Sequence, residues 1–530
     1  MINAAKALQA IGAKGSLPPE RRRPAAIVRA KEHGMGGRKY PQQMIGGVLG
    51  LLLFGHSATV ATPESPTSTI DSPRFTPYSI PATWAPSAKT ALISSRILQE
   101  GNTSAIFDLQ PKQSQELNDN YLGTDLGSYD PGYKNTAVVS PVGFKWIRIS
   151  VTGDPLNWQY VEINPGEYKI NHAVDDLITE YVNNGITIIL NLGVGTGENR
   201  LDSARFKTQR DIDRYGNYVR FMVKHFKGRI AYYEIWNEPD TDTPWGKISV
   251  EDYSALIKQV VPAIREENPS AKIVIGATGG AWASEFPGYD KFSRYTLHID
   301  YLTALLRSGV APLVDVISWH PFYGHRATDP YCHNYPQMVL HLKKLATAEG
   351  FQGGFLAEEV KWRTESNNEP QMQGVSEIVA AKYYLRAIAM HRGLGCIVTI
   401  ALPGAHDPTL QKVQSIHNIC DIMAGANPVS MPIEIHSQAK NIKSYGFSLP
   451  NGDALIALWT DGLPVDEDAG INSTLILSGR SAQQVMVMDA LHGKQQQAIT
   501  RTESSALAIR NLLLKDYPII LRLIKRPRAH

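Results

Sequence analysis

The middle of the chain alternates between short apolar runs and longer amphipathic stretches. Apolar runs of this length suit parallel strands that are buried on both faces. They lie at Tyr121–Gly127, Phe144–Ser150, Ile186–Leu192, Ala231–Trp236, Lys272–Gly276, Val314–Trp319, Gly354–Glu358 and Cys396–Leu402. The stretches between them have the spacing of helices with one apolar face. These predicted helices are Ala173–Val182, Asp211–Phe226, Val250–Glu267, Tyr301–Arg307, Pro336–Ala348 and Glu377–Met390.

Eight strands that alternate with helices are the number that closes a parallel barrel. The sequence therefore predicts an α/β fold, a (β/α)8 TIM barrel, over residues 100–428. An open doubly wound sheet is the alternative, but no glycine-rich dinucleotide fingerprint follows any of these strands.

Beyond residue 430 the helical spacing largely stops, and strand-like segments follow one another. Turn-forming sequences such as Asn451-Gly452-Asp453 separate them. Several short strands with such turns are typical of a β-sandwich, which we predict for residues 429–530. The predicted strands are Lys443–Ser448, Ala454–Trp459, Ser473–Leu477, Ala482–Asp489 and Ile519–Leu523.

The first 61 residues are basic and contain one apolar run. Nine lysines and arginines stand against two glutamates, a net charge of +7, and the run Met44–Phe54 follows the last of these basic residues. A basic segment, an apolar run and an exit of small residues are the layout of a secretory signal. We therefore predict that residues 1–61 are a leader and secretory signal cleaved near Ala61, so that the protein is secreted and extracellular. A translation start at Met35 would suit this layout better.

A flexible linker is predicted over residues 62–95, because they are rich in Ser, Thr and Pro and lack strand or helix periodicity. Two other interpretations of the preceding apolar run are a buried helix and a membrane anchor. Its 11 residues are fewer than the ~20 that cross a bilayer, so no permanent membrane span is expected.

Charge and cysteine content exclude several classes of function. The net charge of the whole chain is +3, so residues 62–530 carry −4 once the +7 of the leader is set aside. Such a body lacks the clustered positive charge of a nucleic-acid-binding protein, and no nucleic acid partner is expected. Cys332, Cys396 and Cys420 are too few for a disulfide framework, although one pair could form outside the cell, and they have no metal-site spacing. We expect no cofactor and no metal.

Acidic residues follow two of the predicted barrel strands. Catalytic groups of such barrels sit at the carboxyl ends of the strands, where side chains converge over one opening. Strand Ala231–Trp236 leads into Glu238, and strand Gly354–Glu358 leads into Glu359. Glycosidic cleavage needs two carboxyl groups, one protonated to donate to the leaving oxygen and one ionised to attack the anomeric carbon. Burial and like-charge proximity can hold their pKa values apart.

Residue strings at four strand ends resemble motifs of clan A glycoside hydrolases. Trp236-Asn237-Glu238-Pro239 resembles the acid/base motif, in which an Asn-Glu pair ends the fourth barrel strand. Lys145-Trp146-Ile147-Arg148 looks like the second strand, and Ser318-Trp319-His320-Pro321-Phe322-Tyr323 is similar to the sixth-strand segment. Glu358-Glu359-Val360-Lys361-Trp362 resembles the seventh-strand pattern Thr-Glu-x-Gly-Trp. The resemblance covers roughly residues 120–525 and is greatest to glycoside hydrolase family 39 and its relatives.

The resemblance implies that Glu238 is the acid/base and Glu359 the nucleophile. An alternative stays open, because Glu358 stands where the clan usually has a small hydroxyl residue and could itself be the nucleophile. The position of Trp362 favours Glu359. The eighth strand, Cys396–Leu402, lacks the tryptophan that many clan members use as the floor of the sugar pocket.

Supporting residues follow from the same motifs. Arg148 matches the arginine that contacts the nucleophile, and His320 and Tyr323 match the residues that flank it. Asn237 is expected to hydrogen-bond the sugar 2-hydroxyl, a contact that strengthens in the transition state. Trp362 is expected to contact or support the substrate.

The predicted function is that of a glycosidase. We expect a retaining glycoside hydrolase that cleaves O-glycosidic bonds of an extracellular oligo- or polysaccharide by double displacement on two carboxylates. The alternative is a catalytically inactive carbohydrate-binding protein on the same fold, for which the missing tryptophan and the doubled glutamate leave room. A third interpretation, a membrane-tethered interaction protein that uses only the sandwich, requires that residues 35–61 stay on the mature chain.

Overall fold

The computed structural model describes most of the chain from residue 97 onward. The described residues are 97–98, 104–112, 114–117, 120–126, 142–149, 155–193, 206–241, 248–279, 300–322, 327–364, 374–405, 407–479, 482, 484–503 and 506–525. All of them lie in the second of the two units into which the chain divides, residues 60–530. The predicted leader and secretory signal (1–61), the predicted linker (62–95) and Tyr323 lie outside the described residues.

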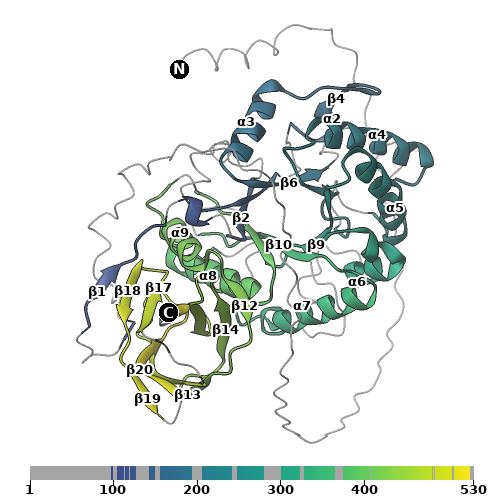
Figure 1. The fold of residues 1–530 in the computed structure, drawn as a ribbon. Coiled ribbons are helices and arrows are strands. Elements are labelled where there is room, and N and C mark those ends of the chain that lie inside the picture. The colour runs from purple at the N-terminus through teal and green to yellow at the C-terminus, as the bar shows by residue number, and fades with distance from the viewer. Residues whose placement is uncertain are drawn as a thin grey trace, which may run out of the picture. The chain divides into compact units, whose positions relative to one another are not determined.

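Eight parallel strands close into a barrel, as predicted (Figure 1). Each barrel strand pairs with the next one along the chain, and the last pairs back with the first. The strands are β2 (Leu122–Leu126), β3 (Trp146–Ile149), β6 (Thr187–Leu192), β7 (Tyr232–Ile235), β8 (Lys272–Thr278), β9 (Val316–Trp319), β10 (Gly354–Val360) and β11 (Ile397–Ile400). The closed ring rules out the open doubly wound sheet.

The six predicted helices are present between these strands. The structure has them as α3 (His172–Asn183), α4 (Gln209–His225), α5 (Val250–Glu267), α6 (Tyr301–Leu305), α7 (Pro330–Ala348) and α8 (Glu377–Gly393). Hydroxyl side chains cap three of them: Thr208, Ser249 and Ser376 each accept a hydrogen bond from the backbone N–H three residues on. Helix α7 begins six residues earlier than predicted, with Pro330 in its first turn, where a missing N–H costs nothing.

Several elements escaped the prediction. Helix α9 (Gln411–Met423) follows Leu410, which offers no capping side chain, so the sequence lacks the usual start signal. The other elements that were not predicted are short: η2 (Ser114–Leu117), α2 (Trp158–Val161), β4 (Glu162–Asn164), β5 (Glu167–Tyr168), η5 (Leu306–Val310) and η6 (Ala311–Leu313).

The C-terminal part consists of two antiparallel sheets, which confirms the predicted β-sandwich. The larger sheet has the order β1-β18-β17-β21-β15-β14-β12, and the smaller has the order β13-β16-β20-β19. Five of these strands match the predicted ones: β14 (Ile442–Ser448), β15 (Ala454–Thr460), β16 (Ile471–Ser478), β17 (Gln484–Asp489) and β21 (Ile519–Ile524). The others were not predicted: β1 (Ile106–Asp108), β12 (Asn427–Val429), β13 (Glu434–Ser437), β18 (Lys494–Gln497), β19 (Thr500–Glu503) and β20 (Ala506–Leu514). Strand β1 precedes the barrel in sequence and pairs with β18.

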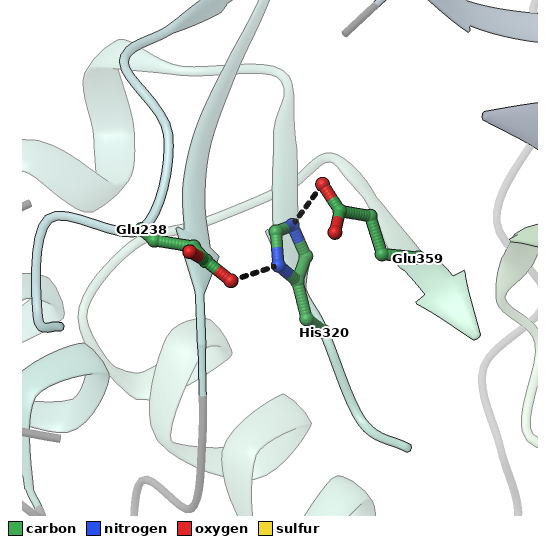
Figure 2. A group of neighbouring side chains, drawn as sticks. All are labelled: Glu238, His320 and Glu359. Atoms are coloured by element: carbon green, nitrogen blue, oxygen red, sulfur yellow. Dashed lines mark hydrogen bonds and ion pairs between the residues drawn. The ribbon is translucent and has the colours of Figure 1, made fainter. Parts of the chain in front are cut away.

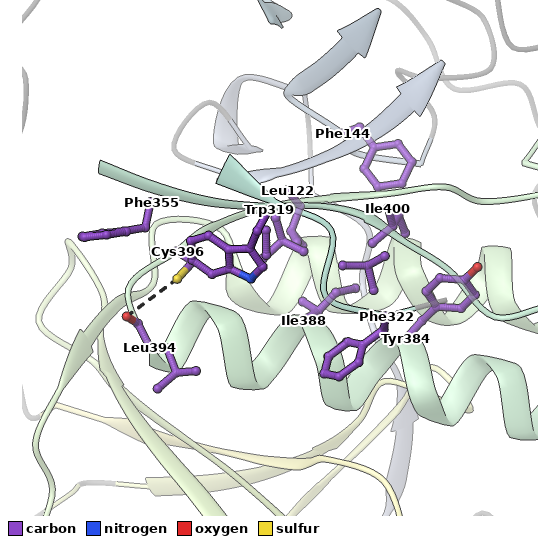
Figure 3. Close-up of a cluster of buried hydrophobic side chains, with 14 of the residues drawn as sticks. Leu122, Phe144, Trp319, Phe322, Phe355, Tyr384, Ile388, Leu394, Cys396 and Ile400 are labelled. Carbon is purple, nitrogen blue, oxygen red and sulfur yellow. Dashed lines mark hydrogen bonds between the residues drawn. The ribbon is translucent and has the colours of Figure 1, made fainter. Parts of the chain in front are cut away.

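Helix α8 is buried on most of its surface because it packs on the barrel and also contacts the sandwich. Figure 3 shows Tyr384 and Ile388 of α8 among strand residues such as Leu122 and Ile400. On its other side, the Arg386 guanidinium donates to the backbone carbonyls of Asp516, Gly462 and Thr460 at 2.7, 2.7 and 3.1 Å. These bonds join the barrel to the C-terminal sheets.

The inside of the barrel has an apolar layer near the amino ends of the strands. It is formed by one side chain from each strand or from the residue just before it: Tyr121, Trp146, Ile189, Tyr232, Val274, Val316, Leu356 and Ile397. Interior layers of this kind are what makes such a barrel a packed core and not a pore.

None of the described helices is both long enough and apolar enough to cross a membrane. The three cysteines all lie in the described part of the chain, where none of them forms a disulfide; Cys396 and Cys420 are buried and Cys332 is partly buried.

Candidate active site

A polar layer lies directly above the apolar one. Side chains two residues apart on a strand point to the same face, so the next inward positions follow the apolar set at a spacing of two. Six strands place buried polar residues there: Arg148, Asn191, Glu234, Ser318, Glu358 and Thr399. The site is built on this layer.

Arg148 of β3 is the centre of the polar layer and is fully buried. Its Nε donates to Glu234 Oε2 at 2.7 Å, and one terminal nitrogen donates to Glu359 Oε1 at 2.7 Å. The other terminal nitrogen donates to Asn237 Oδ1 at 2.6 Å. Asp125 of β2 lies 3.6 Å from the guanidinium. One arginine thus contacts residues of three other strands or their ends, β2, β7 and β10.

Glu238 lies just beyond the end of β7, and its side chain is 14% exposed. Its backbone N–H donates to the carbonyl of Ala277 at 2.9 Å, which ties the turn to β8. The backbone has positive φ angles at Trp236 (68°) and Glu238 (45°). For a residue with a side chain, such a conformation costs on the order of 1–3 kcal/mol and persists where the surroundings enforce it.

The two consecutive glutamates of β10 both reach Arg148, which a regular strand would not allow. In a regular strand, neighbouring side chains point to opposite faces. Here the pairing of β10 with β11 shifts register between Ala357 and Val360, and Glu359 has a φ of 51°. This bulge turns Glu359 inward, so that Glu358 Oε2 and Glu359 Oε1 lie 3.0 and 2.7 Å from Arg148 nitrogens.

His320, directly after β9, lies between the two candidate catalytic carboxylates (Figure 2). Its Nδ1 is 3.2 Å from Glu238 Oε1, and its Nε2 is 3.8 Å from Glu359 Oε1. One oxygen of each carboxylate and one ring nitrogen all lie within 4.8 Å of one another. The acids at the ends of β7 and β10 therefore face the same space.

The charges around Glu359 hold it ionised. Burial of its carboxyl group opposes ionisation, but the charges of His320, Arg148 and Lys361 outweigh burial and lower the pKa of Glu359 to about 2. His320 experiences the converse: burial opposes its charge, yet Glu359, Glu238 and Glu358 raise its pKa well above the ordinary value.

Glu358 is held in the opposite protonation state. Burial raises its pKa to about 8, against the opposing charge of Arg148 and with the help of the negative charge of Glu234. Two neighbouring acids are also shifted upward, chiefly by burial: the pKa of Asp125 rises to about 6 and that of Asp240 to about 7. Glu234 has a lowered pKa, because Arg148 and hydrogen bonds from Glu358 and Asn191 outweigh its burial. Adjacent glutamates thus differ in charge at neutral pH.

The trio Glu238, His320 and Glu359 does not suit a resident metal ion. A protonated imidazole has no lone pair to give to a cation. Arg148 also occupies Glu359 with a short ion pair. The arrangement fits a pair of acids with a cationic side chain between them.

The structure brings together six of the eight residues predicted for the site, namely Arg148, Asn237, Glu238, His320, Glu358 and Glu359. Tyr323 lies outside the described residues. Trp362 is only 4% exposed and stacks on Tyr383 at a ring distance of 5.1 Å. Its backbone N–H donates to the Tyr384 hydroxyl, so Trp362 packs against α8 beside the site.

Sequence reasoning missed the supporting acids and amides. Glu234 accepts hydrogen bonds from Arg148, Asn191 and Ser318, and Asp125 Oδ2 accepts one from the backbone N–H of Glu359 at 3.0 Å. For Glu234, Asn191 and Ser318 a signal was present, because each is a polar residue in a mostly apolar strand; Asp125 follows Thr124 and stands out less. Asp240 gave no such signal, because it lies in a loop, where acids are common; its Oδ1 accepts from Gly279 N–H at 2.8 Å.

Comparisons with known proteins bear on the family and the fold. A family model for cellulases (glycosyl hydrolase family 5) matches residues 130–303. A family 39 glycoside hydrolase from the gut symbiont Bacteroides cellulosilyticus WH2 has a similar structure, with 16% identity over 77% of this chain and 82% of that chain and a TM-score of 0.53. CelM2, a bifunctional glucanase-xylanase from a metagenome library, has 12% identity over 80% of this chain and 98% of that chain, with a TM-score of 0.50. No curated protein sequence matches significantly.

At such low identity the two structures bear on the fold alone, and they bear out the predicted likeness to family 39 at that level. The family model adds sequence information over β3, β6, β7 and β8, which include Arg148 and the Glu238 motif. The family match over part of the barrel and the fold together support a clan A glycoside hydrolase, a glycosidase built on a TIM barrel with a C-terminal β-sandwich.

Proposed function

We propose that this glycosidase acts with retention of configuration, with Glu238 as acid/base and Glu359 as nucleophile. The observation that carries the proposal is the approach of the two carboxylates: one oxygen of each lies within 4.8 Å of the other. Carboxyl groups about 5–5.5 Å apart suit a covalent intermediate, whereas inversion needs about 6.5–9.5 Å to admit a water.

The choice of Glu359 over Glu358 rests on access and charge. The Glu359 side chain is 19% exposed and its pKa is lowered to about 2, so the attacking form is the stable one. The Glu358 side chain has no exposure, and a nucleophile must reach the anomeric carbon.

In the first step the Glu359 carboxylate forms a bond to the anomeric carbon, while Glu238 donates its proton to the departing glycosidic oxygen. In the second step Glu238 takes a proton from water, the water oxygen bonds to the anomeric carbon, and the bond to Glu359 breaks. Arg148 and His320 hold the Glu359 carboxylate in place through both steps.

The remaining predicted residues have supporting parts in this proposal. Arg148 engages the side-chain oxygen of Asn237, so the amide NH2 is the group that would donate to the sugar 2-hydroxyl. Tyr323 is proposed to flank the nucleophile beside His320. Trp362 is proposed to support the site from behind, given its burial against Tyr383.

We further propose that the substrate is an extracellular oligo- or polysaccharide and that the chain is exported by cleavage near Ala61. The basic and apolar pattern of residues 1–61 supports export. Amino-terminal sequencing of the mature protein tests it: a first residue close to 62 is expected, and a chain that keeps residues 35–61 would favour a tethered protein.

Two variants test the catalytic pair. Glu238→Gln should abolish hydrolysis of glycosides with poor leaving groups but keep much of the first-step rate on an activated aryl glycoside, which needs no proton. Glu359→Ala should be inactive on both, and added azide should restore turnover with formation of a glycosyl azide. Full activity of Glu238→Gln on both substrates would disprove its role.

The substrate and stereochemistry require a panel of glycosides and polysaccharides with proton NMR of the first-formed anomer. Glucans and xylans come first, because the matching family model describes cellulases and one similar structure is a glucanase-xylanase. Binding without turnover on every substrate would support the alternative of an inactive carbohydrate-binding protein. The arrangement of Glu238 and Glu359, two carboxyl groups that face the same space, favours hydrolysis over this alternative.

A further inference from the structure

Glu358 is a buried acid of the polar layer that the proposed mechanism does not use. It lies on β10 directly before Glu359, and its side chain is fully buried. Its oxygens lie 3.0 Å from Arg148 Nε and 3.6 Å from His320 Nε2.

The supply of hydrogen-bond donors is too small for an ionised Glu358. Arg148 Nε carries one hydrogen, and it goes to Glu234 Oε2 at 2.7 Å. Among the described residues, no donor of good geometry reaches either oxygen of Glu358. A buried carboxylate without donors is costly, whereas a carboxylic acid brings a donor of its own. That donor has an acceptor at hand, because Glu234 Oε2 and Glu358 Oε2 lie 2.7 and 3.0 Å from the same atom, Arg148 Nε.

The charges that face Glu358 also favour a proton on it. Arg148 and His320 are the cations that face it from β3 and the end of β9. Five acids meet these two cations within the cluster: Asp125, Glu234, Glu238, Glu358 and Glu359. Tyr253 of α5 also faces Glu358: burial raises the pKa of Tyr253 well above its ordinary value, and the charge of Glu358 raises it further. Lys361 lies three residues after Glu358, just beyond the end of β10. A neutral Glu358 reduces the excess of negative charge by one.

We propose that Glu358 is a positioning residue that works as a neutral carboxylic acid: it donates a hydrogen bond to Glu234 and thereby leaves Arg148 bound to Glu359. This inference rests on the proposed function. Ionised Glu358 would lose its bond to Glu234, compete for the Arg148 guanidinium and place a second negative charge beside the nucleophile. The chemical step should therefore fail when Glu358 loses its proton.

The test is the pH dependence of kcat/KM on an activated aryl glycoside. With such a substrate the first step needs no proton from Glu238, so a loss of rate at alkaline pH reports another group. Because burial raises the pKa of Glu358 to about 8, the wild-type rate should fall above that pH, by about tenfold per pH unit. The whole protein is used throughout, with thermal unfolding as a check on folding at each pH.

Glu358→Gln keeps the size and the donor but cannot ionise. We expect it to retain activity at pH 6 within about fivefold of wild type and to lose the alkaline fall. Glu162→Gln is the matched control, the same change at another buried glutamate, whose carboxylate accepts from the Gly166 N–H; it should keep the wild-type fall.

Two results would overturn the inference. One is an alkaline fall that persists unchanged in a folded Glu358→Gln protein. The other is azide rescue of Glu358→Ala, which would make Glu358 the nucleophile; azide rescue of Glu359→Ala instead keeps the proposed function intact and leaves the pH test to decide. If Glu358→Gln does not fold, the wild-type infrared spectrum decides: a protonated carboxylic acid band must disappear on titration near pH 8, and its absence contradicts the inference.

Discussion

The apolar and polar layers of the barrel interior lie two residues apart on the same strands, yet they follow different rules. The apolar layer takes one side chain from each strand or from the residue just before it, for example Trp146, Ile189 and Leu356. The polar layer above it has Arg148, Asn191 and Glu358 at the corresponding positions. Most positions of both layers are buried, so burial alone does not determine which kind of residue a position accepts.

The difference lies in how the two layers gain stability. Each apolar side chain contributes on its own, by roughly 1.5–3 kcal/mol when fully buried. A buried polar side chain contributes only when its partners are present, because an unpaired charge or donor is costly. The polar layer should therefore fail as a unit where the apolar layer fails one residue at a time. Four predictions test this contrast.

The largest effect is expected for Arg148→Met, which keeps most of the volume but removes the cation shared by Glu234, Glu358 and Glu359. Breaking a buried ion pair on one side costs about 3–5 kcal/mol in the free energy of unfolding. Activity should fall by at least about a thousandfold, because the nucleophile loses its main partner. Denaturant unfolding at pH 7 and kcat on an aryl glycoside measure both losses. A stable, active variant would mean that the acids do not act as a unit.

A loss of stability without loss of catalysis is expected in the apolar layer. Leu356→Ala, two residues before Glu358, should lower the free energy of unfolding by about 2–5 kcal/mol through the cavity it leaves. The folded protein should keep kcat within about threefold of wild type, since no hydrogen bond of the site is touched. A large fall in kcat at full folding would show that the two layers are coupled.

The stability contributed by buried acids such as Glu358 should depend on pH near neutrality, whereas the stability contributed by Leu356 in the apolar layer should not. The pKa of Glu358 is raised from an ordinary 4.5 to about 8. Between these values the unfolded chain has lost the proton that the folded protein keeps, so this group's contribution to stability falls as the pH rises from 4.5 to 8. Asp125 and Asp240, with pKa values raised to about 6 and 7, act in the same direction.

Glu358→Gln removes the largest of these contributions. Its free energy of unfolding should therefore depend less on pH than that of wild type, by roughly 1–3 kcal/mol between pH 5 and 8. Leu356→Ala is the matched control, because it lowers stability but should leave the slope unchanged. Equal slopes in wild type and Glu358→Gln would argue against a buried proton on Glu358.

The contrast between apolar and polar positions also explains how much of the fold could be predicted from the sequence. Strands such as Ile186–Leu192 were predictable because both faces of a barrel strand are buried and the run is almost continuously apolar. Strands β13 and β19 of the sandwich were missed, because most of their residues are polar and only their pairing with neighbours makes them strands. Helix α9 was missed for want of a capping residue.

In the candidate active site, the positions of acids at strand ends identified the catalytic candidates but not their protonation states. Glu238 and Glu359 were predictable from motifs, and the structure places them face to face. The division of roles between Glu358 and Glu359 was not predictable, because it depends on a bulge and on three-dimensional neighbours from β3, β7 and β9. The contact between Glu234 and Asn191 would have needed the barrel register, which pairs these two residues across β6 and β7.

The smallest predicted effect concerns the bulge that brings both glutamates to the polar layer. Glu359 has a φ of 51°, a conformation that costs a residue with a side chain about 1–2 kcal/mol and that glycine adopts freely. The greater freedom of glycine in the unfolded chain offsets part of this relief of strain. The Glu359→Gly protein should therefore be more stable than Glu359→Ala by only about 0.5–1 kcal/mol. Both variants lose the same carboxylate, so their difference isolates the backbone.

The exposed helix position Glu180 supplies the control for this comparison, since Gly there should be less stable than Ala by about 1 kcal/mol. Opposite signs at the two positions, measured by denaturant unfolding, would establish that the bulge is strained in the native protein. Glycine less stable than alanine at both positions would show instead that the turn carries no strain, and that the polar layer costs the barrel less than its geometry indicates.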